Sequence, residues 1–345
     1  MSTNRAPIAI TGFGWEIPTF GVQPSLTEAL QHAQVDNPLF SPELTLGKKG
    51  LRYKERSTLM AMCAAKLALQ HAGLVDDASR KLDDPGFGVA VASNTGNLDT
   101  VCRAADTIRR EHVNATSPMD LPNASSNIVA STIAIRFGLK ALNLMICSGA
   151  SASLDALIVA ANAIRNGRAQ RMLVATVESG GSALCSLLAG GRQELDEAEA
   201  PLLEGAGAVV LEARDYALDR GAIIHGYLSD HMYAHADAHD AQPASDWFTR
   251  QQSKSIYLPG GSFLSRMASG HDQVIDLGGP ITRSYGSAAL LQLIHACEQL
   301  RGAAPVRGFD PAGDGVVIVG GGNWMDRRGG AVAVDAPGRA DGTAR

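Results

Sequence analysis

Short apolar segments that are typical of buried strands alternate along this chain with longer segments of helical periodicity. The strand-like segments are PIAITGFG, FGVAVASNTG, ALNLMI, RMLVATVE, GAGAVVLEA and, late in the chain, GDGVVIVGGG. Between them lie KERSTLMAMCAAKLALQHAGL, SSNIVASTIAIRFGL, LDALIVAANAIRNG and GSAALLQLIHACEQLRG, which have the spacing of helices. Strands that alternate with helices form a mainly parallel sheet covered on both faces, so the sequence predicts an α/β fold.

The length of 345 residues predicts two domains or one large duplicated domain. The opening PIAITGFG and the late GVVIVGGG are similar in kind, which favours two related halves. We place these halves at residues 1–215 and 216–335, the second one shortened, with a frayed tail at 336–345. After about residue 228 the segment SDHMYAHADAHDAQPASDW is polar and predicts an irregular loop.

Charge and composition argue against a nucleic-acid partner. The formal net charge is -5 and aromatic residues make up only 5% of the chain, whereas binding to phosphate backbones and bases needs a positive field and stacking side chains. One basic run does occur, KKGLRYKER. It is either a solvated surface or a landing patch for a small acidic carrier, and its cationic residues are Lys48, Lys49, Arg52, Lys54 and Arg56.

The cysteines indicate a reducing compartment. There are five of them, an odd number without CxxC spacing, so we expect reduced core thiols at Cys63, Cys102, Cys147, Cys185 and Cys297. The chain enters a strand within a few residues of Met1 and has no apolar run of about twenty residues, which predicts a cytoplasmic protein without a membrane span.

Three histidines raise the question of a metal site. His231, His235 and His239, with Asp237 and Asp240, would share one face if the segment were helical. The segment has no apolar period to hold a helix, so we interpret it as a solvated or pocket-rim loop. We predict no metal and no other cofactor.

Several segments resemble the β-ketoacyl synthase branch of the thiolase superfamily, in the order and spacing of that family. They are PIAITGFGWEIPTFG, KERSTLMAMCAAKLALQHAGL, GVAVASNTGNLDT, SPMDLPNASSNIVASTIAIRFGLKALNL and LLEGAGAVVLEARDYALDRGAIIHG, and together they cover roughly residues 7–228. The resemblance implies a duplicated, layered αβαβα architecture with mainly mixed or parallel sheets.

The resemblance also implies a catalytic cysteine, and this chain lacks it. In such synthases a cysteine at a helix N-terminus accepts the acyl chain as a thioester. A gap-free comparison from Phe137 to Glu178 puts that position at Ala150, whose methyl group cannot carry an acyl chain. Cys147, three residues upstream, is a rival nucleophile that we interpret as a core residue, and we expect Ser148, Ser151 and Ser153 to cap the helix.

Two histidines that the family uses for decarboxylation are missing as well. No loop of the type AHGTGT occurs, and PITRSYGSAALLQL places Arg283 where the second histidine would stand. Gly278 stands where a lysine is usual. With three catalytic positions changed, we expect no catalytic residue in this chain.

Synthase-like chains without the nucleophile are similar to chain length factors, and SGASASLDAL resembles the corresponding factor segment, with alanine where glutamine is common. The resemblance implies pairing with an active ketosynthase, delivery by an acyl carrier protein, and a role in type II polyketide, aryl-polyene or fatty-acid-like biosynthesis. It also implies that the SP-x-x-x-P loop closes the partner's acyl cavity through Met119, Asp120, Leu121 and Asn123.

Two other hypotheses stay open. The chain could be an independent acyltransferase, hydrolase or decarboxylase that uses Cys147 or a nearby serine. It could also be a homodimeric module that captures an acyl carrier without a synthase.

Overall fold

The computed structural model of the chain describes residues 5–19, 25–33, 40–76, 81–94, 96–181, 183, 186, 202–237, 241–268, 271, 273–301, 313–322 and 326–337. Its strands are β1 (Ile8–Glu16), β2 (Phe87–Ala92), β3 (Asn143–Ile146), β4 (Arg171–Glu178), β5 (Gly205–Ala213), β6 (Gly226–His235), β7 (Ser255–Tyr257), β8 (Val274–Ile275), β9 (Gly315–Gly321) and β10 (Arg328–Asp335). The α-helices are α1 (Leu26–Gln31), α2 (Pro42–Leu46), α3 (Arg56–His71), α4 (Leu98–Glu111), α5 (Ile128–Phe137), α6 (Ala152–Arg165), α8 (Arg214–Asp219), α9 (Gln242–Thr249), α10 (Gly279–Thr282) and α11 (Ala288–Leu300).

The strand order shows an internal duplication. Within the described residues the ten strands follow the order β3-β2-β4-β5-β1-β6-β10-β9-β7-β8. In the first half β1 is antiparallel to β5 and β5 to β4, whereas β4, β2 and β3 are mutually parallel. In the second half β6, β10, β9, β7 and β8 repeat this sequence of pairings and directions. The duplicated α/β architecture with mixed sheets is therefore confirmed, and β1 joins β6 at the centre.

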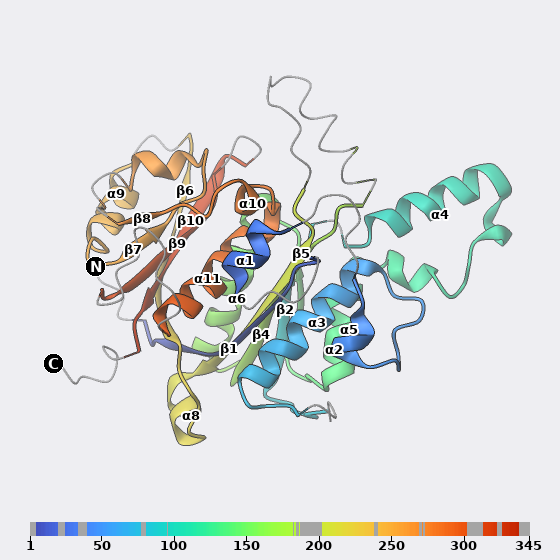
Figure 1. Cartoon of the computed structure of the whole chain (residues 1–345), viewed down its shortest axis with the longest axis horizontal. Helices are drawn as coiled ribbons and strands as arrows, with labels where there is room; N and C mark the ends of the chain where they lie inside the picture. The colour runs from blue at the N-terminus through green and yellow to red at the C-terminus, as the bar shows by residue number, and fades with distance from the viewer. Residues whose placement is uncertain are drawn as a thin grey trace.

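Two helices lie between the halves and form the middle layer. Helix α6 contacts β2 and β4 of the first half and β9 and β10 of the second, and α11 contacts both β5 and β9 (Figure 1). Almost every residue of both helices is buried, because the sequences ASLDALIVAANAIR and AALLQLIHACEQL are apolar or small all round. The alanines let each helix approach both sheet faces closely.

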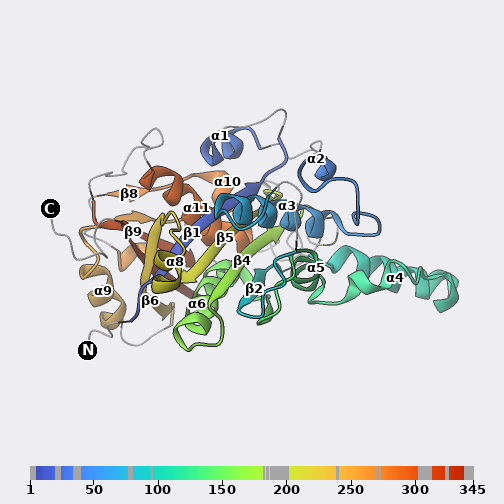
Figure 2. The same ribbon diagram turned by 90° about the horizontal axis from the view of Figure 1, so that it is seen from below.

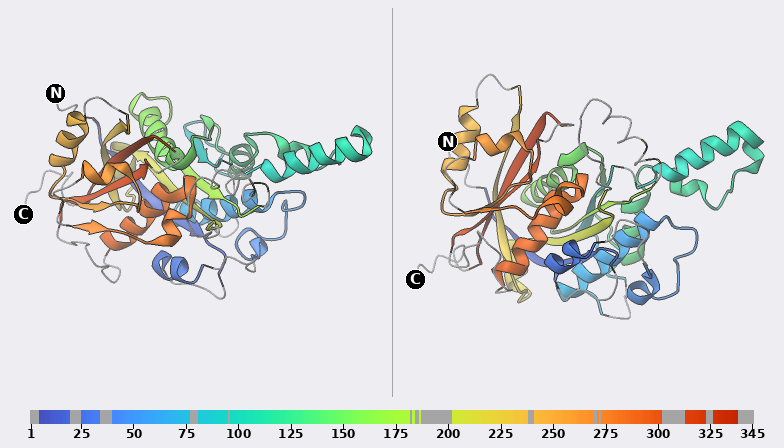
Figure 3. Two further views of the ribbon diagram at one scale, coloured as in Figure 1. Left: turned by 90° about the horizontal axis from the view of Figure 1, so that it is seen from above. Right: turned by 45° about the horizontal axis from the view of Figure 1, so that its top comes forward.

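Outer helices cover the other sheet faces. Helices α3 and α5 pack on the outer face of the first half, with Met60, Leu69 and Phe137 in their shared core. On the second half the cover is thinner, and α9 supplies Trp247 and Phe248. Figure 3 shows this unequal cover, with the long α3 on one side and the short α9 on the other. The second half, β6 to β10, also spans fewer residues than the first, as the sequence predicts.

One prediction for the second half is wrong. The polar segment that begins at Ser229 was expected to be an irregular loop, but β6 continues to His235. Strand β10 pairs with it along this length, and its apolar residues supply the burial that the β6 sequence lacks. His239 and Asp240 lie outside the described residues, as does most of the tail at 336–345. The boundary proposed at residue 215 falls within α8 and stays a prediction.

A helical arm projects from the body. Helix α4 stands away from the sheet, and the segment after it returns toward α5 (Figure 2). Thr100 is the one buried residue of α4, and Ile108 and Val113 are exposed apolar side chains. No helix among the described residues is both long and apolar enough to cross a membrane.

Close contact between β1 and α3 depends on Gly12. A Cβ atom at this position would lie 2.5 Å from the carbonyl oxygen of Ala68 and 2.7 Å from the Cβ of Ala72. We predict that Gly12→Ala lowers the free energy of unfolding by about 2 kcal/mol or more, because the helix backbone must move. Urea denaturation measures this change. Gly279→Ala is the control, since nothing lies within 4 Å of its added carbon, and equal midpoints for both variants would contradict the packing described here.

Candidate functional site

The candidate site lies where β3 runs into α6. After Ile146 the chain passes Cys147 and Ser148 and makes a 3-10 turn at Gly149–Ser151 before α6 begins. Gly149 has a φ of 73°, a conformation that glycine adopts without strain. Ala150 follows it, is 5% exposed, and presents a methyl group at the helix N-terminus. Ala150 thus lies at a helix start, and its correspondence to the nucleophile position stays a prediction.

The backbone N–H of Ala150 is already bonded. It donates to the Oδ2 atom of Asp326, which lies at the start of the segment that leads into β10. A Cβ atom on Gly149 would lie 2.5 Å from the same oxygen, so the carboxylate fits closely over this turn. An N–H group at a helix start is the usual holder of an oxyanion, and here the protein's own carboxylate occupies that role.

Two further polar groups fix the turn. Asn94 donates from Nδ2 to the carbonyl oxygen of Gly149 over 3.0 Å and accepts from the N–H of Gly149 over 2.9 Å. The same Asn94 amide donates to Oε1 of Glu178 over 2.7 Å. Glu178 is almost fully buried at the end of β4. The turn is thus held rigidly from the carboxyl ends of β2 and β4.

A second helix starts at the same place. The 3-10 turn Tyr285–Ser287 precedes α11 and packs on the turn that precedes α6. Burial, together with the carboxylates of Asp326 and Glu178, raises the pKa of Tyr285 to about 12. Tyr285 is therefore a neutral hydroxyl at ordinary pH. Two helix N-termini and two carboxylates meet here, which places negative charge where the helix dipoles favour it.

The serines of this region belong to another network. Ser148 donates to Oδ2 of Asp155 over 2.6 Å, and Ser151 donates to the same atom over 3.2 Å. Tyr233 and Arg328 bond to Oδ1 of Asp155 at 2.7 Å and 3.1 Å. Neither Ser148 nor Ser151 makes a side-chain capping bond, so the expectation that they cap the helix is wrong. They anchor a buried carboxylate instead. The Oγ of Ser153 does not cap α6 but accepts from the N–H of Leu290 in the first turn of α11.

The cysteines differ from the prediction of core thiols. Cys63 and Cys297 are buried as expected, but Cys102 on the arm and Cys147 after the edge strand β3 are exposed. Cys147 donates from Sγ to the carbonyl oxygen of Ser93 over 3.0 Å. Partial desolvation, then the charge of Glu178, raises the pKa of its thiol. Among the described strands β3 pairs only with β2, so the segment that follows its other edge is open to solvent, and the sequence pattern does not show this. Cys185 lies outside the described residues.

Arg283, which stands where the resemblance implies a histidine, bonds to a backbone carbonyl of its own short helix. It ends α10, two residues before the turn that leads into α11, and its Nε donates to the carbonyl oxygen of Gly279 over 3.2 Å. Gly278, with a φ of 75°, is the N-cap of the same short helix. A guanidinium turned toward backbone carbonyls is no general base.

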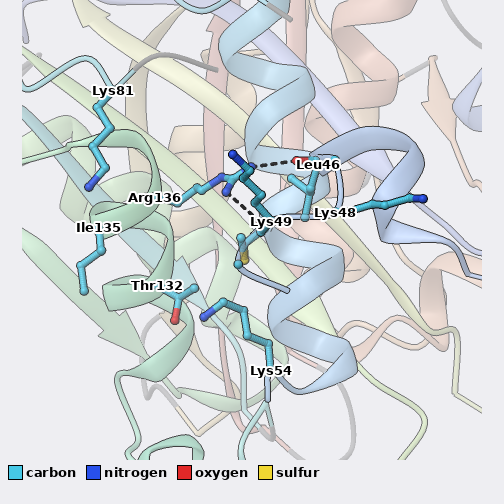
Figure 4. A pocket seen from close by; sticks show the side chains of 11 residues that line it. Leu46, Lys48, Lys49, Lys54, Lys81, Thr132, Ile135 and Arg136 are labelled. Carbon is cyan, nitrogen blue, oxygen red and sulfur yellow. Dashed lines mark hydrogen bonds between the residues drawn. The ribbon is translucent and has the colours of Figure 1, made fainter. Parts of the chain in front are cut away.

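The five cations of the basic run lie in three different surroundings. Lys48, Lys49 and Lys54 line a cavity of about 710 Å³ (Figure 4). Arg52 lies over the ring of Tyr53. Arg56 turns away and pairs with Glu204, with Nη2 2.7 Å from Oε2. The structure therefore does not keep all five cations on one surface.

The predicted interface residues lie between the arm and α5. Met119 and Leu121 are 57% and 42% exposed, and Asp120 is half-buried. Asn123 is buried and donates from Nδ2 to the carbonyl oxygen of Tyr53 over 2.7 Å. Asn123 thus fixes the loop to the body, whereas Met119 and Leu121 face outward.

The histidines of β6 are spread along a strand. His231 contacts the guanidinium of Arg5, and desolvation, with Arg5 and Arg165 nearby, lowers the pKa of His231 to about 4. Among the described residues, no cluster of three or more histidine, cysteine or acidic side chains could hold a metal ion.

Sequence reasoning missed Asn94, Glu178, Asp326 and Tyr285. Glu178 had one usable signal, since a carboxylate that closes a fully apolar strand marks a polar site at the sheet edge. Asp326 had none, because 176 positions separate it from Ala150.

Comparisons with known proteins show what this chain is similar to in sequence. Residues 45–190 match the family described as beta-ketoacyl synthase, N-terminal domain. The chain is 28% identical over 217 residues to 3-oxoacyl-[acyl-carrier-protein] synthase I, chloroplastic, of Arabidopsis thaliana, which is 58% of this chain and 46% of that protein. It is 29% identical over 203 residues to 3-oxoacyl-[acyl-carrier-protein] synthase 2 of Rhizobium meliloti, which is 54% of this chain and 48% of that protein. The aligned region thus spans about half the length of these curated relatives.

Solved structures share the fold over nearly the whole chain. One chain from the structure of a type II PKS acyl-carrier protein in complex with its ketosynthase superposes with a TM-score of 0.77 at 17% identity, over 96% of this chain and 100% of the other. The ishigamide ketosynthase/chain length factor gives a TM-score of 0.76 at 15% identity, over 96% and 99%. At these identities the likeness concerns the fold, which is thereby confirmed as thiolase-like.

The raised pKa of Cys147 leads to a prediction about its reactivity. Because the thiolate is the nucleophile, a pKa above the ordinary 9.0 leaves less thiolate at pH 8. We expect iodoacetamide to alkylate Cys147 more slowly than the cysteine of a short unstructured peptide, with an inflection above pH 9 in the rate profile. Peptide mass mapping over a pH series measures this, with Cys147→Ser as the blank. A rate at pH 7 that exceeds that of the peptide would contradict the assignment.

Proposed function

We propose that this chain, a relative of the β-ketoacyl synthases, is a non-condensing subunit that pairs with an active ketosynthase and shapes the cavity for the growing acyl chain. This is the role of a chain length factor in type II polyketide, aryl-polyene or fatty-acid-like biosynthesis. An acyl carrier protein would deliver extender units to the partner's cysteine. This subunit would contribute an interface and part of a wall.

One observation carries the proposal: the helix start that would bear the nucleophile holds Ala150, with its N–H bonded to Asp326. Acyl transfer to a thiolate requires both a sulfur and a free donor for the oxyanion. This site offers neither. The carboxylates of Asp326 and Glu178 would also repel a carboxylated extender unit.

The surface features support a partner chain. Strand β3 pairs with β2 alone among the described strands, so its second edge is open to another chain. The arm and the loop after it also expose apolar residues, including Met119 and Leu121. An open strand edge and exposed apolar side chains are each typical of a surface that another subunit covers.

The carrier contact is proposed for Lys48, Lys49, Arg52 and Lys54. These side chains keep their charge on the surface, where a small acidic protein would be attracted. Arg56 is left out of this surface, because its charge is committed to Glu204.

The alternative of an independent acyltransferase or decarboxylase has less support. Cys147 is accessible, but its pKa is raised and its hydrogen bond goes to a carbonyl oxygen. The hydroxyls of Ser148 and Ser151 are bonded to Asp155, whose carboxylate also pairs with Arg328.

Co-expression with a ketosynthase encoded beside this chain tests the pairing. We expect a stable one-to-one complex by size exclusion and native mass spectrometry, and condensation only when both chains are present. A homodimer that ignores the synthase would instead support the carrier-binding module. An acyl adduct on the isolated wild-type chain after incubation with acyl thioesters would support the independent enzyme.

We predict that a sulfur alone does not restore acylation. In Ala150→Cys the new thiolate would lie beside Asp326, which raises its pKa and keeps the backbone donor engaged. In the double variant with Asp326→Ala, thiolate attack on an acyl thioester would form the protein thioester and release the donor thiol. We expect adduct formation at least tenfold faster than in Ala150→Cys, measured by intact-protein mass spectrometry in a Cys147→Ser background. Equal rates of adduct formation in the single and double variants would contradict the proposed role of Asp326.

We predict that Met119 limits product length in the complex. Met119→Ala would open space at the end of the partner's cavity, where each blocked methylene costs about 0.8 kcal/mol of lost burial. Products extended by at least one unit are expected by liquid chromatography and mass spectrometry. Ile223→Ala is the control, because Ile223 is 66% exposed but lies between α8 and β6. An unchanged product with normal pairing would assign Met119 to interface packing alone.

A further inference from the structure

A cationic cavity lies between the α2–α3 connection and α5, away from the turn at Ala150. Its volume is about 710 Å³, within the range of small-ligand sites. Figure 4 shows side chains that enter it from three separate parts of the chain. The lining contains the positively charged residues Lys48, Lys49, Lys54, Lys81 and Arg136.

The charges in this cavity lack a counter-charge in its lining. No aspartate or glutamate is among the described residues that line it. Arg136 donates from Nη2 to the carbonyl oxygen of Leu46 over 2.8 Å and from Nη1 to that of Lys49 over 3.1 Å. Carbonyl groups orient the guanidinium but do not neutralise it. Burial and then the charge of Arg136 lower the pKa of Lys54, which is the electrostatic cost of holding these cations together.

The remaining lining is apolar or backbone. Leu46 and Met62 are buried, and Ile135 is an exposed apolar side chain at the cavity. The loop that carries Lys48 and Lys49 begins at Gly47 and ends at Gly50, with φ values of 71° and 78°. Glycine adopts both positive φ values without strain, which lets this short loop turn at each end beside the cavity.

We propose that this cavity binds an organic phosphate ester, with the phosphate among Lys54, Lys81 and Arg136 and the apolar part of the ligand against Ile135. Several fixed cations match a phosphate, which carries about two charges and three acceptor oxygens, better than a single carboxylate. The ester is either a free coenzyme of the coenzyme A type or the phosphate-bearing prosthetic arm of a carrier protein. The second source rests on the proposed function, and the first does not.

Direct titration tests the site in the full chain. Isothermal calorimetry with coenzyme A and with pyrophosphate is expected to show one site, with affinity that falls as salt rises. Lys54→Ala and Lys81→Ala are each expected to weaken binding at least tenfold. Arg168→Ala is the control, because it removes an exposed cation that neither lines the cavity nor belongs to the proposed carrier contact, and it should change affinity by less than twofold. Circular dichroism checks that the variants fold.

A second pair of titrations distinguishes the two sources. Apo-carrier and holo-carrier differ only by the phosphate-bearing arm, so tighter binding of the holo form that is lost in Lys81→Ala supports the carrier-borne ester. Coenzyme A binding with equal affinity for both carriers supports the free ester. If neither coenzyme A nor pyrophosphate binds, or if Arg168→Ala weakens binding as much as Lys81→Ala, the site is overturned, while pairing with a ketosynthase is untouched.

Discussion

Two buried helices begin at one point, and the structure must balance the positive end of both helix dipoles there. Helix α6 starts after Ser151 and α11 after Ser287, and the 3-10 turns that precede them pack on each other. In a buried site, water cannot supply the compensating negative charge. Asp326 supplies it at the N–H of Ala150, and Glu178 supplies it through Asn94. The two carboxylates therefore lie where both helix dipoles are positive.

Some strands of the first half could be predicted residue by residue, but helix α4 was not predicted. RMLVATVE is β4 and GAGAVVLEA is β5, because mostly apolar runs between glycine turns have few other solutions in an α/β chain. Gly138, with a φ of 73°, ends α5 as the sequence indicates. The second half was less predictable, since β6 is polar beyond Leu228 and owes its strand conformation to pairing with β10.

The site was predictable only where it is local in sequence. The gap-free spacing within one strand and one helix predicts Ala150 at a helix start, where the structure has it, but the residues that surround this turn come from three distant segments. Charge runs show the same limit. The five cations of KKGLRYKER are adjacent in sequence, yet the fold directs Arg56 to Glu204 and gathers Lys54 with the distant Lys81 and Arg136. The sequence shows which charged residues are present, but only the tertiary structure shows which of them lie close together.

Loss of the nucleophile is compatible with a stable fold for a physical reason. Thiolates and oxyanion holes keep polar groups unsatisfied until substrate binds, and such groups cost stability. Here the N–H of Ala150 is satisfied by Asp326 and the methyl group fills the buried space at the helix start. The interior around α6 is thereby complete without a ligand. The features that stay open lie on the outside, at the second edge of β3, on the exposed arm and in the cationic cavity, and these are the surfaces that the proposed pairing and the proposed phosphate binding would use.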